Sequence, residues 1–521
     1  MAAGVLTPCL FSLLPLYAQV SIGSYRYADE TQVWRLTDNA AAMPLDLLVC
    51  DSSANRGIAQ FATRHQEGDY HRVQEGGISN HLAFFTERYQ KIGQYLYGYG
   101  SFHFDMGRTK QRAWSDVIRT YNSNPFLSGS SVAGRYDNQD FELKGSLATV
   151  QLGRFTYGAN ILYNVGDLSR LRDPRSRINL AEYRLAPAVT CQIAKRQASS
   201  KYLGLALHYD RRKEKLTNLT TVQTDPSLAY YVMTGLENAE GTIGGYQGYM
   251  REYVNHELGG ELSYGVTVQN AKCNVKSVNA LTIDQGTEYV YGTYKYEPGK
   301  YKTLKYGLSS RNRLLAGSLL HTADVAVGYG QGYANEYKEE RVTTKDADTG
   351  ETSTTWNRLL TYRKRYQLKL LDTELHYRLS WLDSEEVAGY VGGRYALQSV
   401  SNKHVLHTSE LKYAASWMEV EGGLSVKRHL WIEATAGYRA SHKALLDLND
   451  AATDYAQAVL IPDMPFYEAN YFMGTLQLTC QLPLTIKGYT ANWFAKVQGS
   501  YLKTNNSLDR STVGLSIGLY Y

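Results

Sequence analysis

The chain has 521 residues, with 55 Lys and Arg against 50 Asp and Glu, so its formal net charge of +5 is small for its length. A balance of this kind gives no electrostatic basis for binding nucleic acid. The sequence contains 44 Tyr and 45 Gly but only 12 Phe and 11 Pro, and Tyr suits a surface that is apolar along the ring and wet at the hydroxyl, as at a membrane interface. The cysteines are scattered, and no Cys or His spacing predicts a metal site, a disulfide framework or another cofactor.

Residues 1–18 are the only long apolar run. The run is short, contains prolines and ends in Ala18-Gln19, which predicts a secretory signal peptide cleaved after Ala18. The basic residues that usually open such a signal are missing, so we expect the true translation start further upstream. No later stretch is apolar enough to form a transmembrane helix.

Residues 19–56 form the next segment. Asp38 and Asn39 are good N-cap residues for a helix over Ala40–Leu48, and Pro44 predicts that this helix is short or kinked. We expect this segment at the periplasmic end of the domain that follows, or inside its lumen.

From residue 57 to residue 521, apolar and polar side chains alternate with the period of a strand that has one apolar and one polar face. In the final segment, Ser511–Tyr521, one face carries Val513, Leu515, Ile517 and Leu519, and the other carries Thr512 and Ser516. An exported chain without membrane helices can pair every backbone group by closing such strands into a barrel. The predicted fold class is therefore all-β, a transmembrane antiparallel β-barrel whose last strand pairs with a first strand near Gly57–Thr63.

The connections between these segments alternate in length. Short connections are expected near 152–154, 196–200, 271–274, 316–318, 383–386 and 427–429, and long polar ones at 107–138, 213–256, 338–357 and 443–465. Short periplasmic turns and long extracellular loops are typical of outer-membrane barrels. Counting back from the C-terminus under the even-number rule gives about 18 strands, with about 14 or 16 as alternatives. The loops 107–138 and 213–256 are long enough to fold into the mouth.

Three short motifs carry a resemblance to known families. A final strand that ends in an aromatic residue resembles the C-terminus of outer-membrane barrels. The stretch from Trp34 to Met43 resembles the start of fatty-acid-transporter-type barrels, with Ala40 where those barrels have proline. The whole chain, with its Ala-Gln signal ending, W-x-L-x-x-N-x-A opening and Tyr-rich strands, is similar to an uncharacterised outer-membrane β-barrel family of Bacteroidota. This resemblance implies a location in the bacterial outer membrane, but no substrate.

Charged residues on the polar faces of two strands are the candidate site. Asp372, Glu374, His376 and Arg378 share one face of a strong strand, and they form either a selectivity ladder for polar solutes or a set of internal ion pairs. His208 and Asp210 share the polar face of another strand, where a hydrolase site is the less favoured alternative. No catalytic motif such as GxSxG or HExxH occurs.

These features favour a protein that is not an enzyme. The first hypothesis is a channel or transporter for small or amphiphilic solutes. The second is a scaffold barrel that holds a surface lipoprotein or a periplasmic partner. Outer-membrane lipid is the partner expected in both cases.

Overall fold

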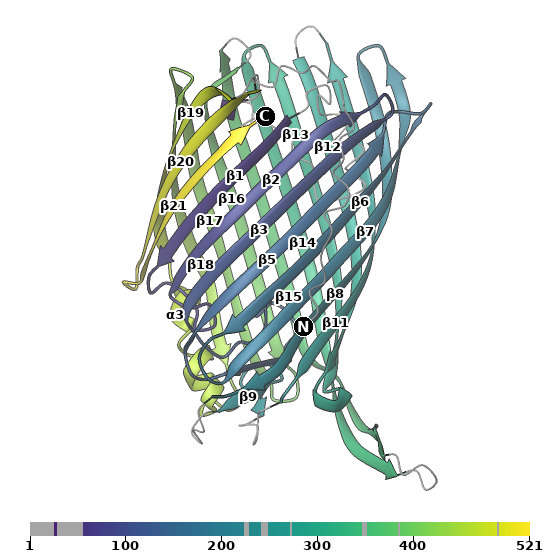
Figure 1. Cartoon of the computed structure of the whole chain (residues 1–521), viewed down its shortest axis with the longest axis vertical. Helices are drawn as coiled ribbons and strands as arrows, with labels where there is room; N and C mark the ends of the chain where they lie inside the picture. Colours follow the sequence, from purple (N-terminus) through teal and green to yellow (C-terminus); the bar gives the residue numbers. More distant parts are fainter. Residues whose placement is uncertain are drawn as a thin grey trace.

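Eighteen strands form one antiparallel sheet that closes into a barrel (Figure 1). The computed structural model describes residues 26–28, 56–222, 229–240, 248–270, 273–345, 352–383, 386–486 and 489–521. The wall strands are β1 (Arg56–Glu67), β2 (Ile78–Ile92), β3 (Leu96–Arg112), β5 (Gly134–Thr149), β6 (Phe155–Arg170), β7 (Arg175–Arg196), β8 (Ser199–Thr220), β11 (Arg251–Gln269), β12 (Cys273–Tyr291), β13 (Gly299–Ala316), β14 (Leu319–Lys345), β15 (Thr352–Asp383), β16 (Glu386–His404), β17 (Ser409–Val426), β18 (Leu430–Asp447), β19 (Tyr471–Ile486), β20 (Tyr489–Thr504) and β21 (Asp509–Tyr520). The predicted all-β barrel and the strand number of 18 are confirmed, and the alternatives of 14 and 16 strands are wrong.

The barrel closes where its two ends meet. β1 pairs with β2 on one side and with β21 on the other, with Ile58 opposite Tyr520 and Glu67 opposite Ser511. Backbone hydrogen bonds between Gly57 and Tyr521 extend this pairing to the last residue. The strand that ends the sequence is therefore the closing strand of the barrel, as its alternation and its position predicted.

The outer surface of the wall is apolar. Leu375 and Ile432 are exposed by 46% and 39%, and Val513, Leu515 and Ile517 of β21 also point outward. The intervening residues of the same strands face the lumen, so each strand has one face for lipid and one for the interior. A closed barrel with an apolar outer band leaves no unpaired sheet edge in the hydrocarbon, and such barrels belong to the bacterial outer membrane. The described residues contain no helix that is both long and apolar enough to cross a membrane.

The long connections lie at one end of the barrel and the short turns at the other. By the usual orientation, the short turns, such as the one between Ala316 and Leu319, are periplasmic. One expected loop differs. The predicted loop at 338–357 is instead a paired extension of β14 and β15, in which Lys345 lies opposite Thr352.

We call residues 338–345 and 352–361 the arm, which projects beyond the barrel in Figure 1. Thr recurs along both strands of the arm, with Val342 on the first, and these β-branched residues favour extended, paired backbone over a loop. The hydroxyls of Thr344 and Ser353 meet across the pair at 2.8 Å. Polarity alone predicts a loop here, because a hairpin in water needs no apolar face toward lipid.

The extracellular mouth is filled by folded-in connections that we call the cap, residues 113–130, 229–239 and 449–469. Three short strands of the cap, β4 (Leu127–Ser130), β9 (Tyr230–Met233) and β10 (Ala239–Glu240), form a separate sheet. Two short helical elements, η2 (Ala456–Leu460) and α3 (Met464–Glu468), complete it, and a further turn, η1 (Thr293–Lys295), lies at the rim.

The cap and the upper wall share one apolar core. The Trp114 ring lies 4.4 Å from that of Tyr231 and 5.5 Å from that of Tyr455, between ring centroids. The buried members of the core are Ala113, Trp114, Val117, Phe126, Leu127, Tyr231, Met233, Leu236, Tyr253, Val290, Tyr301, Ala334, Tyr366, Leu368, Val400, Leu411, Tyr413, Tyr455, Val459 and Tyr467. Burial of so many rings excludes water from this core and stabilises the cap in place. The cap thus packs across the mouth of the barrel.

Candidate functional site

Polar contacts fasten the cap to the wall behind its apolar core. The Asn124 side-chain amide in the cap donates to Glu288 Oε2 on β12 at 2.7 Å. The Tyr253 hydroxyl on β11 donates to the backbone carbonyl of Phe126 at 2.5 Å. All four residues are buried, so each bond forms without competition from bulk water. These bonds hold one position of the cap against the lumen wall.

A second attachment joins the cap to the loop between β1 and β2. The Arg72 guanidinium lies 3.3 Å from the centroid of the Tyr121 ring and forms an ion pair with Glu75. The backbone N–H of Val73 donates to Asp463 Oδ1 at 2.8 Å. Burial raises the pKa of the Asp463 carboxyl to about 7, partly opposed by this hydrogen bond and by the Arg72 charge. Asp463 therefore changes its charge near neutral pH, next to the seam that closes the mouth.

The predicted row on β15 faces the lumen, and every member contacts a polar side chain from β16 or β17. The contacts join Asp372 Oδ1 to Gln398 Nε2 at 2.9 Å, Glu374 Oε1 to Arg394 Nε at 2.8 Å, His376 Nε2 to Glu421 Oε1 at 2.9 Å, and Arg378 Nη2 to Glu421 Oε1 at 2.9 Å. His376 and Arg378 share one oxygen of Glu421, whereas Asp372 and Glu374 each have a partner of their own. This wall is charged and cross-linked by ion pairs, and its role as a selectivity ladder stays a prediction.

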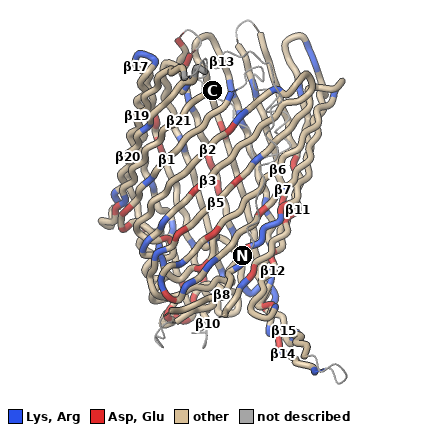
Figure 2. The backbone as a smooth tube through the Cα atoms, viewed as in Figure 1, with Lys and Arg blue, Asp and Glu red and all other residues tan. Residues whose placement is uncertain are grey.

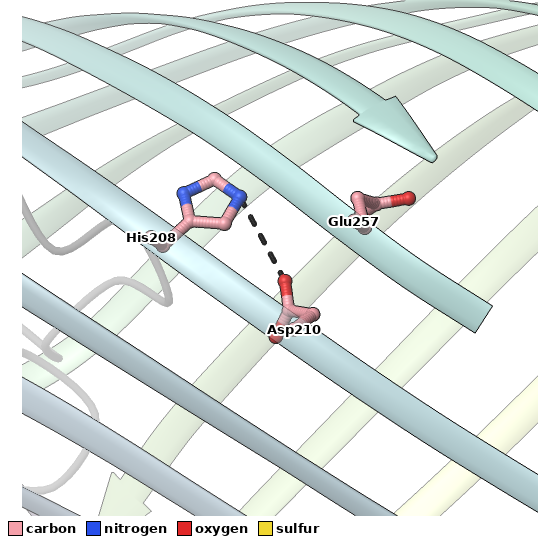
Figure 3. A group of neighbouring side chains, drawn as sticks. All are labelled: His208, Asp210 and Glu257. Atoms are coloured by element: carbon pink, nitrogen blue, oxygen red, sulfur yellow. Dashed lines mark ion pairs between the residues drawn. The ribbon is translucent and has the colours of Figure 1, made fainter. Parts of the chain in front are cut away.

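His208 and Asp210 lie on β8, which is separated from β15 along the wall by β14, β13, β12 and β11, and they belong to a denser cluster (Figure 3). Carboxylates from β11 and β12 join them. His208 Nε2 lies 2.9 Å from Asp284 Oδ1 and 3.7 Å from Asp210 Oδ2, and His208 Nδ1 lies 3.3 Å from Glu261 Oε1. The imidazole is only 1% exposed. A Cβ at Gly259 would lie 2.2 Å from His208 Cε1, so only glycine at that position leaves room for the ring.

The cluster contains donors that suit a metal ion. One atom each from His208, Asp210 and Glu257 lies within 4.8 Å of the others, and imidazole with carboxylates is a common set for divalent metals. The protein supplies its own cations to this set, however. Arg184 Nε lies 2.8 Å from Asp210 Oδ1, and Lys305 Nζ lies 2.7 Å from Glu257 Oε2. Two of the three donors are already neutralised, so the arrangement fits an ion-pair network, and the expected lack of a metal stays a prediction.

Charged residues of this kind run along many wall strands between uncharged positions (Figure 2). Sequence reasoning found His208 and Asp210 but missed Glu257, Glu261 and Asp284, their partners across β11 and β12. The available signal was alternation. Glu257 and Glu261 share the polar face of one strand, and Leu258, Gly260 and Leu262 occupy its other face. The register that brings this face beside His208 is a property of pairing, which sequence patterns do not specify.

The periplasmic end of the lumen receives part of the N-terminal segment. Of residues 19–56, the structure describes 26–28 and Arg56; the predicted signal peptide and the helix over 40–48 lie outside the described residues. The Tyr27 hydroxyl donates to Glu433 Oε2 at 2.5 Å, and its ring lies 5.6 Å from that of Trp431. The Arg26 guanidinium pairs with Glu386 at 2.9 Å. These three residues therefore lie within the barrel, at the end opposite the cap.

Several solved structures match most of the length of this chain at low sequence identity. One is the copper transporter OprC, with a TM-score of 0.38 and 8% identity over 90% of this chain and 80% of that chain. Another is the ferric yersiniabactin uptake receptor FyuA from Yersinia pestis, with a TM-score of 0.36 and 9% identity over the same shares. A mutant ferric enterobactin receptor, PfeA from Pseudomonas aeruginosa, gives a TM-score of 0.41 and 8% identity over 90% and 81%.

No curated protein matches the sequence. The expected similarity to fatty-acid-transporter-type barrels and to proteins of Bacteroidota stays a prediction. The model of one protein family matches residues 45–521, and the chain belongs to that family, the family of unknown function DUF6850.

Proposed function

We propose that this protein is a gated outer-membrane transporter for small polar or amphiphilic solutes, in which the cap is the gate. The observation that carries the proposal is the contrast between the two parts of the lumen. The mouth is sealed by an apolar core, whereas the wall below it is lined with charged side chains. Charged side chains on a lumen wall are the groups that polar solutes would meet during passage. Passage then requires the cap to move.

The attachments of the cap support movement as one unit. Its sheet pairs internally, Leu127 with Met233 and Ala239 with Met233, and none of its described strands pairs with a wall strand. The cap is joined to the wall by side-chain contacts such as Asn124 with Glu288, which can break without unpairing the barrel. Local opening of this kind costs less free energy than unfolding of the whole protein.

A cross-link across this contact tests the gate. Cysteines at Asn124 and Glu288, in a variant without native cysteines, are bridged with the short thiol reagent dibromobimane, and solute flux is measured in loaded liposomes. We expect flux through the unbridged barrel and its loss on bridging. Each single-cysteine variant treated with the same reagent is the control and should keep its flux. Equal flux through bridged and unbridged barrels would show that the cap is not the gate.

A scaffold role is the second candidate, and the arm is the observation that favours it. The arm carries two strands whose outer edges are unpaired among the described residues, and a sheet edge is a template for a strand from a partner. If no solute passes through the intact barrel, and a stoichiometric surface lipoprotein co-purifies with the full chain but not with a variant lacking residues 340–355, the scaffold replaces the transporter. A periplasmic partner would instead survive loss of the arm.

A further inference from the structure

A pocket opens beside the cap, at the base of the arm. Its volume is about 350 Å³, and its walls come from β9 of the cap, the start of β11, the connection between β12 and β13, and the base of β14 and β15. A cavity of this size suits a small molecule. It lies on the extracellular side, outside the sealed mouth, and includes none of the lumen residues described above.

Aromatic side chains form much of this pocket. They are Tyr249, Tyr294, Tyr296, Tyr337 and Trp356. The rings of Tyr296 and Trp356 have centroids 5.1 Å apart, and the Trp356 indole N–H donates to the Tyr294 carbonyl at 2.9 Å. This hydrogen bond fixes the indole on the pocket wall. Ring faces held in this way bind flat ligands with C–H groups or π systems.

The charge of the pocket is positive. Arg251, Lys338 and Arg341 line it, and Glu336 is the one lining carboxylate among the described residues. Glu336 is already paired, with its Oε2 lying 2.6 Å from Arg365 Nη1. Within the described part of the chain, neither Lys338 nor Arg341 forms an ion pair, and each lies over a tyrosine ring instead. The pocket therefore has cationic charge left to offer to a ligand.

Arg251 makes this argument specific. The residue is only 4% exposed; its side chain has the Tyr249 and Tyr253 hydroxyls beside it, but its Nε and Nη1 have no hydrogen-bond partner among the described residues. Leaving a buried charged donor without a hydrogen-bond partner is unfavourable, because the group has lost its water and gained no contact in return. A buried guanidinium on the wall of a pocket, with free N–H groups, is the binding element for a carboxylate or similar anion.

We propose that this pocket binds an acidic saccharide, with its carboxylate on Arg251 and its ring against the aromatic wall. The Thr234 and Thr293 side chains also line the pocket and bring hydroxyl groups to it, as a sugar requires. Val232 and Thr234 belong to the cap, so a bound sugar touches both the cap and the rim. This assignment deepens the proposed transport function by naming a solute class, but binding at the pocket does not depend on passage through the barrel.

Calorimetry on the full chain in detergent tests the assignment with four probes. D-Glucuronate carries both the ring and the carboxylate, D-glucose lacks the charge, benzoate lacks the hydroxyls, and inorganic phosphate lacks the ring. We expect glucuronate to bind at least about tenfold more tightly than each of the others, because only glucuronate satisfies Arg251, the hydroxyls and the ring faces together. Glucose or phosphate binding as tightly as glucuronate would overturn the proposal, and benzoate binding alone would replace the sugar with an aromatic acid.

Variants place the binding in this pocket. Arg251→Met should weaken glucuronate binding by about tenfold or more, and Arg341→Gln, at the more exposed side, by a smaller factor. Lys345→Gln removes a charge from the arm outside the pocket and should leave the affinity unchanged. If Arg251→Met does not fold, Arg341→Gln and Trp356→Ala decide, and full affinity in both would overturn the proposal. Flux is measured separately, so a barrel that binds glucuronate but passes no solute would refute the transporter and retain the site.

Discussion

Asn124 and Glu288 meet at 2.7 Å across the boundary between the cap and the barrel wall. Asn124 is held from both sides, because its Oδ1 also accepts the backbone N–H of Phe126 at 3.0 Å. Glu288 is in turn paired with Arg212 on β8. The Asn124 amide thus links the cap to the charged network of the lumen. A change at this position acts on the gate without breaking the backbone hydrogen bonds between the wall strands.

The first prediction concerns opening of this gate. Asn124→Asp removes the donor and places a second carboxylate beside Glu288, which should destabilise the closed cap by roughly 1–3 kcal/mol. We expect more frequent openings, recorded as a higher open probability in planar bilayers.

The matched control is Asn449→Asp, the same change at an exposed position in the connection between β18 and β19. Solvent screens the new charge there, so conductance should equal that of the unchanged protein. An open probability raised equally by both substitutions would mean that added charge, rather than the lost contact, causes the effect.

The second prediction concerns pH. The pKa of Asp463 is about 7 in the closed cap against an ordinary value of 3.8, so the closed cap binds this proton more tightly than a released one does. The stability of the closed cap should therefore fall as pH rises from about 4 to 7 and stay low above pH 7. Asp463→Asn removes the charge but keeps an acceptor for Val73, so it should slow hydrogen exchange of residues 449–470 at pH 8 and change little at pH 4.

Asp450→Asn is the control for this experiment, because Asp450 is an exposed carboxylate in the same connection. Its exchange profile should match that of the unchanged protein at both pH values. If Asp463→Asn gave the same protection at pH 4 as at pH 8, another group would have to carry the pH dependence.

The architecture could be predicted from the sequence because each strand repeats one physical demand. Lipid on one side and water on the other impose alternation, and Val513, Leu515 and Ile517 satisfy it as plainly as any strand of the barrel. Alternation gives no signal for segments outside the membrane, where both faces of a strand meet water. The arm lies in water, so residues 338–345 and 352–361 show no apolar face, although their β-branched residues form a strand pair.

The sites were harder to predict for a related reason. His208 and Asp210 stood out because they share one strand, but Asp284 and Glu261 reach them only through the register of three strands. The pocket beside the arm is harder still. Arg251, Tyr294 and Trp356 are more than forty residues apart from one another, and no periodicity relates them. Sequence patterns specify faces of elements, whereas these sites depend on which faces meet.

The third prediction tests the two faces of one strand. Val497 is 50% exposed on the outer surface of β20, and its neighbour Gln498 faces the lumen. Val497→Arg should destabilise the folded barrel by roughly 2–4 kcal/mol, because the charge enters hydrocarbon near the midplane, while Gln498→Arg should cost much less. Urea titration in lipid vesicles, followed by the heat-dependent shift of the folded band on gels, measures both. Equal costs at the two positions would be incompatible with a lipid-facing Val497.

The fourth prediction concerns His208. Its ring lies between Asp284 and Glu261 with 1% of its side chain exposed, so His208→Leu leaves the buried Glu261 and the half-buried Asp284 facing an apolar group. Removal of one member from a buried charge cluster costs about 3–5 kcal/mol, and the same urea titration should show it. Adding Asp284→Asn should recover part of the loss, since one of the uncompensated charges is then gone.

His81→Leu is the comparison. His81 also pairs with a carboxylate, that of Asp105 at 2.9 Å, but both side chains are 20% exposed. Water can therefore replace the lost partner, and the free-energy cost should be smaller. Equal costs for the two histidines, or no recovery in the double variant, would mean that the cluster around His208 does not act as a buried charge network.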